Sequence, residues 1–166
     1  MNPRSADTAV VRVTVNGRKR EALVPARMSL ADLLRDQFGL TGTHLGCEQG
    51  VCGACNVLID GETARACLTL AVQVDACDVT TVEGLSPESG LSELQLALAE
   101  HGGLQCGFCT PGVVVTLTEL LASGTALDEG SVRLALTGNL CRCTGYQGIV
   151  DAVLALAAHR DGRSAS

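Results

Sequence analysis

Nine cysteines fall into two spaced sets and one isolated position, and their spacing limits the fold more than any other feature of the sequence. Three of them, Cys47, Cys52 and Cys55, are spaced C-x4-C-x2-C within residues 39–55, a segment with five glycines and no hydrophobic periodicity. With Cys67 as a fourth ligand, this is the plant-type spacing of a [2Fe–2S] cluster. Glycines in such a loop leave backbone N–H groups free to approach the sulfur atoms, which stabilises an anionic cluster. The spacing therefore predicts an iron–sulfur loop.

A second set of cysteines lies in the C-terminal half of the chain. It consists of Cys106, Cys109, Cys141 and Cys143, spaced as C-x2-C and C-x-C. Four thiolates at this spacing could bind zinc, and spacing alone leaves that alternative open. Their places favour an anionic cluster, because Cys109 precedes the predicted helix start Thr110-Pro111 and helix N-termini carry positive potential. A Rieske site is excluded, since none of the three histidines stands in a pattern with these cysteines.

The redox state of the thiols depends on the compartment. The first 15 residues contain no apolar secretory segment, and no stretch approaches the roughly 20 apolar residues of a membrane span. We therefore expect a cytoplasmic protein with reduced thiols and no disulfide framework. The net charge of −6 and the absence of a basic stripe argue against a nucleic-acid partner. A high cysteine content under these conditions indicates bound metal.

Up to about residue 84 the pattern is that of a small mixed sheet with one helix across it. Residues 10–24 alternate between apolar and polar side chains around Asn16-Gly17, which is a strong hairpin signal. Ser29 is expected to cap a helix that runs to about Phe38. Residues 56–60 and 63–70 resemble a second hairpin, and "DVTTVEGL" a last short strand.

Beyond the linker "SPESG" the pattern becomes helical, with four short helices predicted over residues 85–160. Asp128 is expected to cap the third of these helices. Residues 161–166 are expected to form a disordered tail. The predicted fold is thus α+β, with a small mixed-sheet domain that carries the plant-type cluster loop over residues 1–84, followed by a helical domain. Cys77 matches neither cysteine set and is expected to be a buried free thiol.

The segments "GCEQGVCGAC", "QCGFCTPG" and "NLCRCTGYQGIV" together resemble the small iron–sulfur subunit of the molybdenum hydroxylase, or xanthine dehydrogenase, family. The resemblance covers nearly the whole chain, with three long motifs in the same order. It implies a β-grasp domain and a four-helix domain, each with one [2Fe–2S] cluster. It also implies that electrons pass from a molybdenum–pterin cofactor to the helical-domain cluster, then to the β-grasp cluster, and then to FAD.

The same resemblance implies roles for two residues and two partner chains. Gln105 and Cys143 match positions that touch the pterin of the cofactor. The molybdenum–pterin cofactor and FAD would lie on a large and a medium partner subunit, in a dimer of heterotrimers that hydroxylates a small molecule such as an N-heterocycle or an aldehyde. Two other hypotheses are a free-standing ferredoxin-type carrier, which leaves the second cysteine set unexplained, and a zinc-stapled interaction module, which leaves the glycine-rich loop unexplained.

Overall fold

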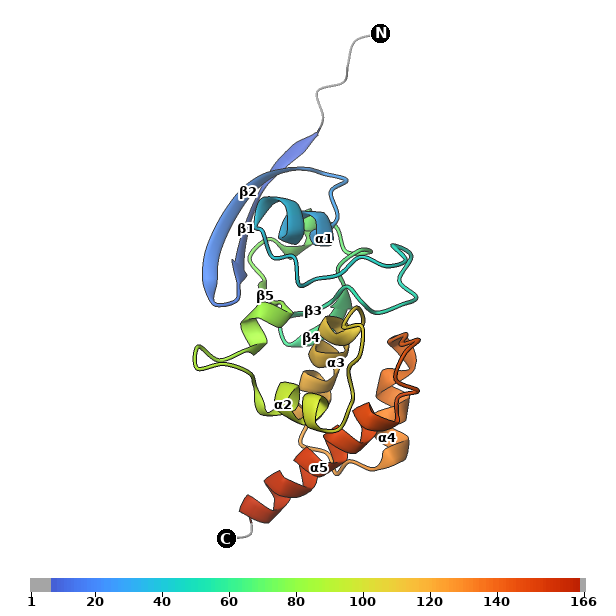
Figure 1. Ribbon diagram of the computed structural model, residues 1–166. Helices are drawn as coiled ribbons and strands as arrows, with labels where there is room; N and C mark the ends of the chain where they lie inside the picture. Colours follow the sequence, from blue (N-terminus) through green and yellow to red (C-terminus); the bar gives the residue numbers. More distant parts are fainter. Residues whose placement is uncertain (1–6, 165–166) are drawn as a thin grey trace.

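Five strands form one mixed sheet in the first half of the chain (Figure 1). The computed structural model describes residues 7–164, and only the backbone of residues 161–164. The strands are β1 (Thr8–Val15), β2 (Arg18–Pro25), β3 (Asn56–Ile59), β4 (Glu62–Arg65) and β5 (Asp78–Thr80). Their order is β2-β1-β5-β3-β4, with β1 and β5 parallel and the other neighbours antiparallel. This mixed order agrees with the small mixed sheet that the sequence predicts and with the β-grasp domain that the family resemblance implies.

The first hairpin follows directly from its sequence. Val11, Val13 and Val15 are all buried, so the alternating apolar face of β1 packs into the core. Asn16 and Gly17 both have positive φ, 51° and 72°, as the two-residue hairpin turn requires. The prediction for this hairpin is confirmed.

The helix across the sheet begins where the sequence predicts but changes form. Ser29 Oγ accepts a hydrogen bond from Asp32 N at 3.1 Å, so the predicted cap is present. After one turn, α1 (Leu30–Asp32), the backbone widens into a π-helical turn, η1 (Leu33–Gln37). Arg35 from this turn donates to the carbonyl groups of Thr41 and Thr43 at 2.9 Å each. The π-helical turn therefore anchors the start of the first cysteine loop.

Two of the expected strand segments are shorter than predicted. Strand β4 ends at Arg65, before Cys67, and β5 ends at Thr80. The segment Val82–Leu85 forms a 3₁₀ turn, η3, instead of continuing the strand. The physical reason is a contact from the first hairpin: Asn16 Oδ1 accepts from Thr81 N at 2.9 Å and lies against Gly84. A second 3₁₀ turn, η2 (Ala71–Val74), precedes β5.

Helices make up the second half of the chain, with a long C-terminal helix packed against the shorter ones (Figure 1). They are α2 (Glu93–Glu100), α3 (Thr110–Ala122), α4 (Glu129–Ala135), the 3₁₀ turn η4 (Leu136–Gly138) and α5 (Gln147–Ser164). The predicted cap of α4 is confirmed, since Asp128 Oδ1 accepts from Ser131 N at 2.7 Å. Helix α5 reaches Ser164, contrary to the tail expected from residue 161, because an established helix extends at one hydrogen bond per residue. Residues 165–166 lie outside the described residues.

Each half of the chain has its own hydrophobic core. One core joins the sheet to α1 and η1, and the other joins α2, α3, α4 and α5. Helix α3 also packs on β3 and β4, so it lies between the sheet and the remaining helices. The exact boundary near residue 84 stays a prediction, although Val82 and Leu85 already pack against the helical core. No helix among the described residues is long and apolar enough to cross a membrane.

Candidate metal centres

The first cysteine set gathers around the loop between η1 and β3. Cys47, Cys52 and Cys55 come from this loop, and Cys67 comes from the turn after β4. Side-chain interactions pair Cys47 with Cys52 and Cys55 with Cys67, and the charge of Cys52 also acts on Cys55. Cys52 N approaches Cys47 Sγ at 3.4 Å, so a backbone N–H group already faces a sulfur atom. Four thiols therefore meet as two neighbouring pairs. We call this group the loop site.

The thiols of the loop site differ in how readily they ionise. Hydrogen bonds from the backbone N–H groups of Gln49 and Cys52 lower the pKa of Cys47 to about 6. Burial raises the pKa of Cys55 to about 11. A thiolate at Cys47 is thus stabilised by the loop itself, and the thiolate is the form that binds metal. Cys55 needs a cation at the site before it loses its proton at neutral pH.

Glycine is required at two positions of this loop. Gly53 has a φ of 72°, and a Cβ on it would lie 2.3 Å from the carbonyl oxygen of Gly138. Gly50 has a φ of 80°, and its Cβ would meet Leu68 Cδ1 at 2.4 Å. Both residues adopt left-handed backbone with no room for a side chain. These two glycines therefore let the loop backbone lie close to Leu68 and to Gly138.

The second cysteine set gathers where α3 begins and where the segment after η4 leads into α5. Side-chain interactions pair Cys106 with Cys143 and Cys109 with Cys141. Helix α3 begins at Thr110, in agreement with the predicted start Thr110-Pro111, but Cys109 and not Thr110 occupies the N-cap position. Cys106 and Cys143 are exposed, whereas the other pair is partly buried. This group, which we call the helical site, again consists of two neighbouring pairs of thiols.

Local hydrogen bonds also set the ionisation of the helical site. Burial raises the pKa of Cys109 to about 12. Burial also acts to raise the pKa of Cys141, but hydrogen bonds from the side chain and backbone of Thr144 outweigh it and lower that pKa. Cys141 N donates to Tyr146 Oη at 2.8 Å, and that hydroxyl donates to Asn139 O at 2.9 Å. The Tyr146 hydroxyl group therefore holds the turn that carries Cys141.

The two sites adjoin one another, which the spacing of the cysteines did not reveal. Leu140 N donates to Cys52 O at 2.8 Å, so a single hydrogen bond joins the residue before Cys141 to a cysteine of the loop site. A second contact joins His44 and Phe108, whose rings stack with centroids 5.0 Å apart while His44 Nδ1 lies 2.8 Å from Phe108 O. Phe108 stands between two cysteines of the helical site. The sequence carried no signal for either contact.

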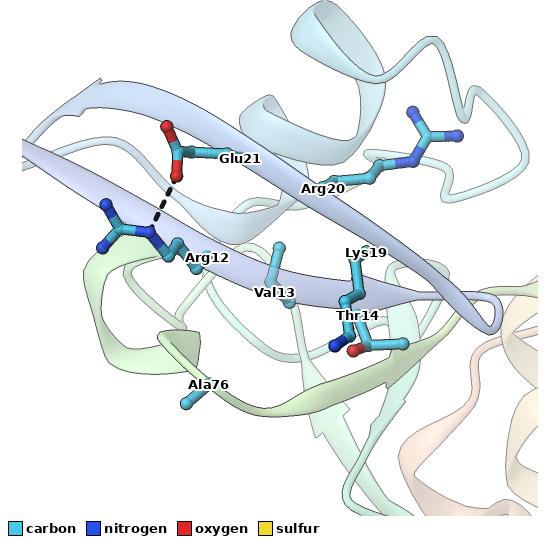
Figure 2. A pocket seen from close by; sticks show the side chains of 7 residues that line it. All are labelled: Arg12, Val13, Thr14, Lys19, Arg20, Glu21 and Ala76. Carbon is cyan, nitrogen blue, oxygen red and sulfur yellow. Dashed lines mark ion pairs between the residues drawn. The ribbon is translucent and has the colours of Figure 1, made fainter.

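Gln105, Cys77 and a pocket beside the first hairpin lie outside the two groups of four thiols. Gln105 is exposed beside Cys106, at the outer edge of the helical site. Cys77 is half-buried at the edge of the sheet core and belongs to neither set, so the expectation of a buried thiol is too strong. Figure 2 shows a pocket on the outer side of the first hairpin, lined by residues such as Lys19 and Glu21 and by no cysteine. Arg12 and Glu21 form an exposed ion pair there at 2.7 Å, which is a surface feature with no visible chemistry.

The arrangement of thiols suits a binuclear cluster. All nine cysteines are free, and eight of them form the four pairs just described. A [2Fe–2S] cluster takes two thiolates on each of its two irons, so a pair of thiol pairs supplies the donors it needs. The thiolate-stabilising N–H groups and the glycine loop fit an anionic cluster as well.

Comparison with known proteins shows what kind of protein this is. Residues 13–79 match the family described as 2Fe-2S iron-sulfur cluster binding domain, and residues 81–154 match the [2Fe-2S] binding domain. The nicotine 6-hydroxylase small subunit of Paenarthrobacter nicotinovorans is 53% identical over 152 residues, which are 92% of each chain. This chain belongs to the small iron–sulfur subunits of the molybdenum hydroxylase, or xanthine dehydrogenase, family.

Two other relatives agree with this assignment of the iron–sulfur subunit. Caffeine dehydrogenase subunit gamma of Pseudomonas sp. (strain CBB1) is 52% identical over 147 residues, covering 87% of this chain and 88% of that subunit. The crystal structure of quinoline 2-oxidoreductase from Pseudomonas putida 86 superposes with a TM-score of 0.89 at 49% identity, covering 95% of this chain and 97% of the matched chain. The iron–sulfur subunit is thus an electron-transfer component of an oxidoreductase complex, with two 2Fe–2S binding domains.

Proposed function

We propose that this iron–sulfur subunit carries electrons from a molybdenum–pterin site on a large partner subunit to FAD on a medium partner subunit. The observation that supports this best is the meeting of two four-thiol sites at one boundary within the chain, joined by the hydrogen bond from Leu140 N to Cys52 O. A single-cluster ferredoxin would need only the loop site. We place the subunit in the cytoplasm, where thiols stay reduced, as cluster binding requires.

The proposal assigns eight cysteines as ligands. The loop site would be held by Cys47, Cys52, Cys55 and Cys67, and the helical site by Cys106, Cys109, Cys141 and Cys143. Each [2Fe–2S] cluster, when bound, supplies a centre that accepts and releases one electron. The chain orients the sulfur atoms and offers N–H groups to them. It also keeps Cys55 away from water and partly shields Cys109.

The outer edge of the helical site supports the proposed direction of electron flow. Gln105, Cys106 and Cys143 are all exposed in this chain, so a cofactor on another subunit could touch them. We therefore assign Gln105 and Cys143 to contact with the pterin. Since Cys143 is also a proposed cluster ligand, the helical site would receive electrons first and the loop site second.

The names of the relatives support a substrate class for the complex. Nicotine, caffeine and quinoline appear in the names of three of them, and all three molecules are nitrogen heterocycles. We propose that the complex hydroxylates a small molecule of this class, with an aldehyde as the alternative substrate. The assembly proposed is a dimer of heterotrimers, each with one copy of this chain.

Metal analysis of the purified chain tests the proposal. Two [2Fe–2S] clusters require about four iron atoms and about four acid-labile sulfides per chain. The dithionite-reduced protein should give two distinguishable EPR signals, because Cys106 and Cys143 are exposed whereas the loop site contains a buried thiol. A colourless protein with stoichiometric zinc would contradict the proposal. Purification of the native protein without larger chains carrying flavin and molybdenum would favour the free-standing carrier instead.

A further inference from the structure

Four polar side chains meet at the boundary between the two cores, where apolar packing would be the common solution. Asn56 and Asn139 are each only 2% exposed, and Arg65 and Thr116 lie between them, partly buried. Asn56 and Arg65 come from neighbouring strands, Thr116 comes from α3, and Asn139 follows η4. Buried polar groups are costly unless they are hydrogen-bonded, so their partners show what this group does. We call these residues the polar chain.

Arg65 binds both sides of the boundary. Its Nε donates to Gly50 O at 3.2 Å, in the first cysteine loop, and its Nη2 donates to Gly138 O at 2.7 Å, at the end of η4. Its Nη1 donates to Asn56 Oδ1. The guanidinium presents its donors in a fixed plane, so three acceptors at once hold the arginine and the acceptors in one arrangement.

Thr116 continues the polar chain on α3. Asn56 Nδ2 donates to Thr116 Oγ1 at 2.7 Å, and that hydroxyl lies within donating distance of Asn139 Oδ1, at 3.1 Å, and of Gly112 O, at 3.0 Å. Asn139 Nδ2 in turn donates to Gly53 O at 3.4 Å. The hydrogen bonds therefore run from the sheet through α3 to Asn139 and back to the loop site.

The ends of the polar chain lie beside the cysteines. Gly50 and Gly53 stand on either side of Cys52, and Asn139 stands two residues before Cys141. Between these ends lies the hydrogen bond from Leu140 N to Cys52 O. The polar chain thus holds together residues 50–53 and residues 139–141, the two segments that the hydrogen bond from Leu140 N to Cys52 O also joins. Hydrogen bonds that only stabilised the fold could lie anywhere along the boundary between the two cores. The bonds of the polar chain instead gather at the two segments that carry cysteines.

We propose that the polar chain of Arg65, Asn56, Thr116 and Asn139 is a positioning device that fixes the separation of the two cluster sites. This inference rests on the proposed function. In the transfer it serves, one reduced cluster loses one electron and the other cluster gains it, and no bond forms or breaks. Electron tunnelling falls steeply with distance, so a fixed separation gives one transfer rate instead of a spread of rates. A fully bonded buried polar network is suited to specify such an arrangement.

The threonines of α3 provide the first test and its matched control. Thr116→Val removes the hydroxyl that links Asn56 with Asn139, whereas Thr118→Val removes only a bond to Val114 O within the helix. In the dithionite-reduced chain, the magnetic splitting between the two clusters reports their separation. We expect the resolved splitting to broaden and be lost in Thr116→Val, and to remain as in the unmodified chain in Thr118→Val.

A second test does not depend on the clusters. Arg65→Gln removes the bond to Gly138 O, whereas Arg20→Gln removes an arginine bond to Phe38 O that stays within the first half of the chain. Hydrogen–deuterium exchange of the Leu140 amide, which is bonded to Cys52 O, then reports how firmly the two segments are held. Loss of the hydrogen bond to Gly138 O should speed exchange of the Leu140 amide by roughly tenfold in Arg65→Gln. The exchange should be unchanged in Arg20→Gln.

The outcomes of these two tests distinguish a failure of the positioning role from a failure of the proposed function. Zinc in place of iron would contradict the proposed function, while the exchange of the Leu140 amide would still show whether the polar chain holds the segments. Equal splitting and equal Leu140 exchange in Thr116→Val, Arg65→Gln and their controls would overturn the positioning role. Loss of iron from both Thr116→Val and Arg65→Gln would overturn it as well, because the polar chain would then be needed for folding.

Discussion

Cys77 differs from the other cysteines in its surroundings. Its Sγ has no cysteine neighbour, and it lies 3.8 Å from Asp75 O and 4.0 Å from Gln73 O. Burial and the nearby Asp60 raise its pKa, so the side chain stays a neutral thiol. Because the side chain is half-buried, a polar replacement can reach both water and the two carbonyl groups.

We expect Cys77→Ser to leave the iron content at about four atoms per chain, since eight other cysteines provide the ligands of two clusters. The cost in the free energy of unfolding should stay below about 1 kcal/mol, because the serine hydroxyl can donate to Gln73 O or Asp75 O. Iron analysis and urea unfolding of the variant check both values. Cys67→Ser serves as the control that should lose a cluster, and loss of iron from Cys77→Ser would show that the ligands are wrongly assigned.

Tyr146 holds the helical site through its hydroxyl group. Tyr146→Phe would leave Cys141 N–H and Asn139 C=O without their partner, which should cost roughly 1–2 kcal/mol of the free energy of unfolding. The midpoint of urea unfolding measures this loss. Thr137→Ala, which removes an exposed bond to Leu134 O, is the control and should change stability by less than about 0.5 kcal/mol. Equal midpoints for the two variants would contradict the role of the tyrosine hydroxyl.

At the scale of the element, α3 carries both the N-cap cysteine of the helical site and the contact with the sheet. Gly112, in its first turn, is buried against the loop site. A Cβ on this glycine would lie 2.0 Å from Gly53 O and 3.1 Å from Ala54 Cα, and both of these are backbone atoms. The helix can therefore approach the loop this closely only with glycine at position 112.

Alanine at two helical glycines should have opposite effects. Gly112→Ala should destabilise the chain by about 1–3 kcal/mol, because the added methyl group forces α3 away from the loop site. Gly130→Ala in α4 meets only Asp128 Oδ1 at 3.5 Å and should stabilise the chain by up to about 1 kcal/mol through helix propensity. Urea unfolding compares the two variants. A stabilising Gly112→Ala would show that α3 does not pack this closely on the loop.

At the scale of the whole molecule, the two sites have different access to partner chains. The helical site exposes two of its cysteines and Gln105, whereas the loop site keeps Cys55 buried. In the proposed complex, the exposed edge would meet the molybdenum–pterin cofactor. The order of electron flow then depends on contacts that this chain makes only in the complex.

Gln105→Ala in the assembled complex tests that order. The substitution should slow the reduction of both clusters by substrate, because it removes the proposed pterin contact. It should leave reduction by dithionite unchanged, since dithionite needs no molybdenum. Rapid-freeze EPR follows both reactions. Gln37→Ala, at an exposed glutamine outside both sites, is the matched control and should affect neither reaction. Equal rates of substrate reduction in the two variants would remove Gln105 from the pterin contact.

The sequence by itself determined the features that arise within a few residues. The Ser29 and Asp128 caps bond to backbone groups three residues away, and Asn16-Gly17 forms its turn locally. The plant-type spacing of Cys47, Cys52 and Cys55 is likewise a feature of a single loop. Such features depend on local backbone geometry, which residue type alone largely fixes. For the same reason a mixed-sheet half and a helical half could be predicted, since the hydrophobic period changes from two to about 3.6 at the linker.

Only the tertiary structure decided how the two sites meet. Asn139 and Gly53, which bond across the boundary, are 86 residues apart in the chain, and Arg65 and Gly138 are 73 apart. The π-helical turn after Asp32 and the early end of β5 at Thr80 are likewise absent from the local pattern. Residue type limits what a side chain can bond to, but not which of many acceptors it will meet. That choice is made when the two cores pack together, because buried polar groups must then find partners within reach.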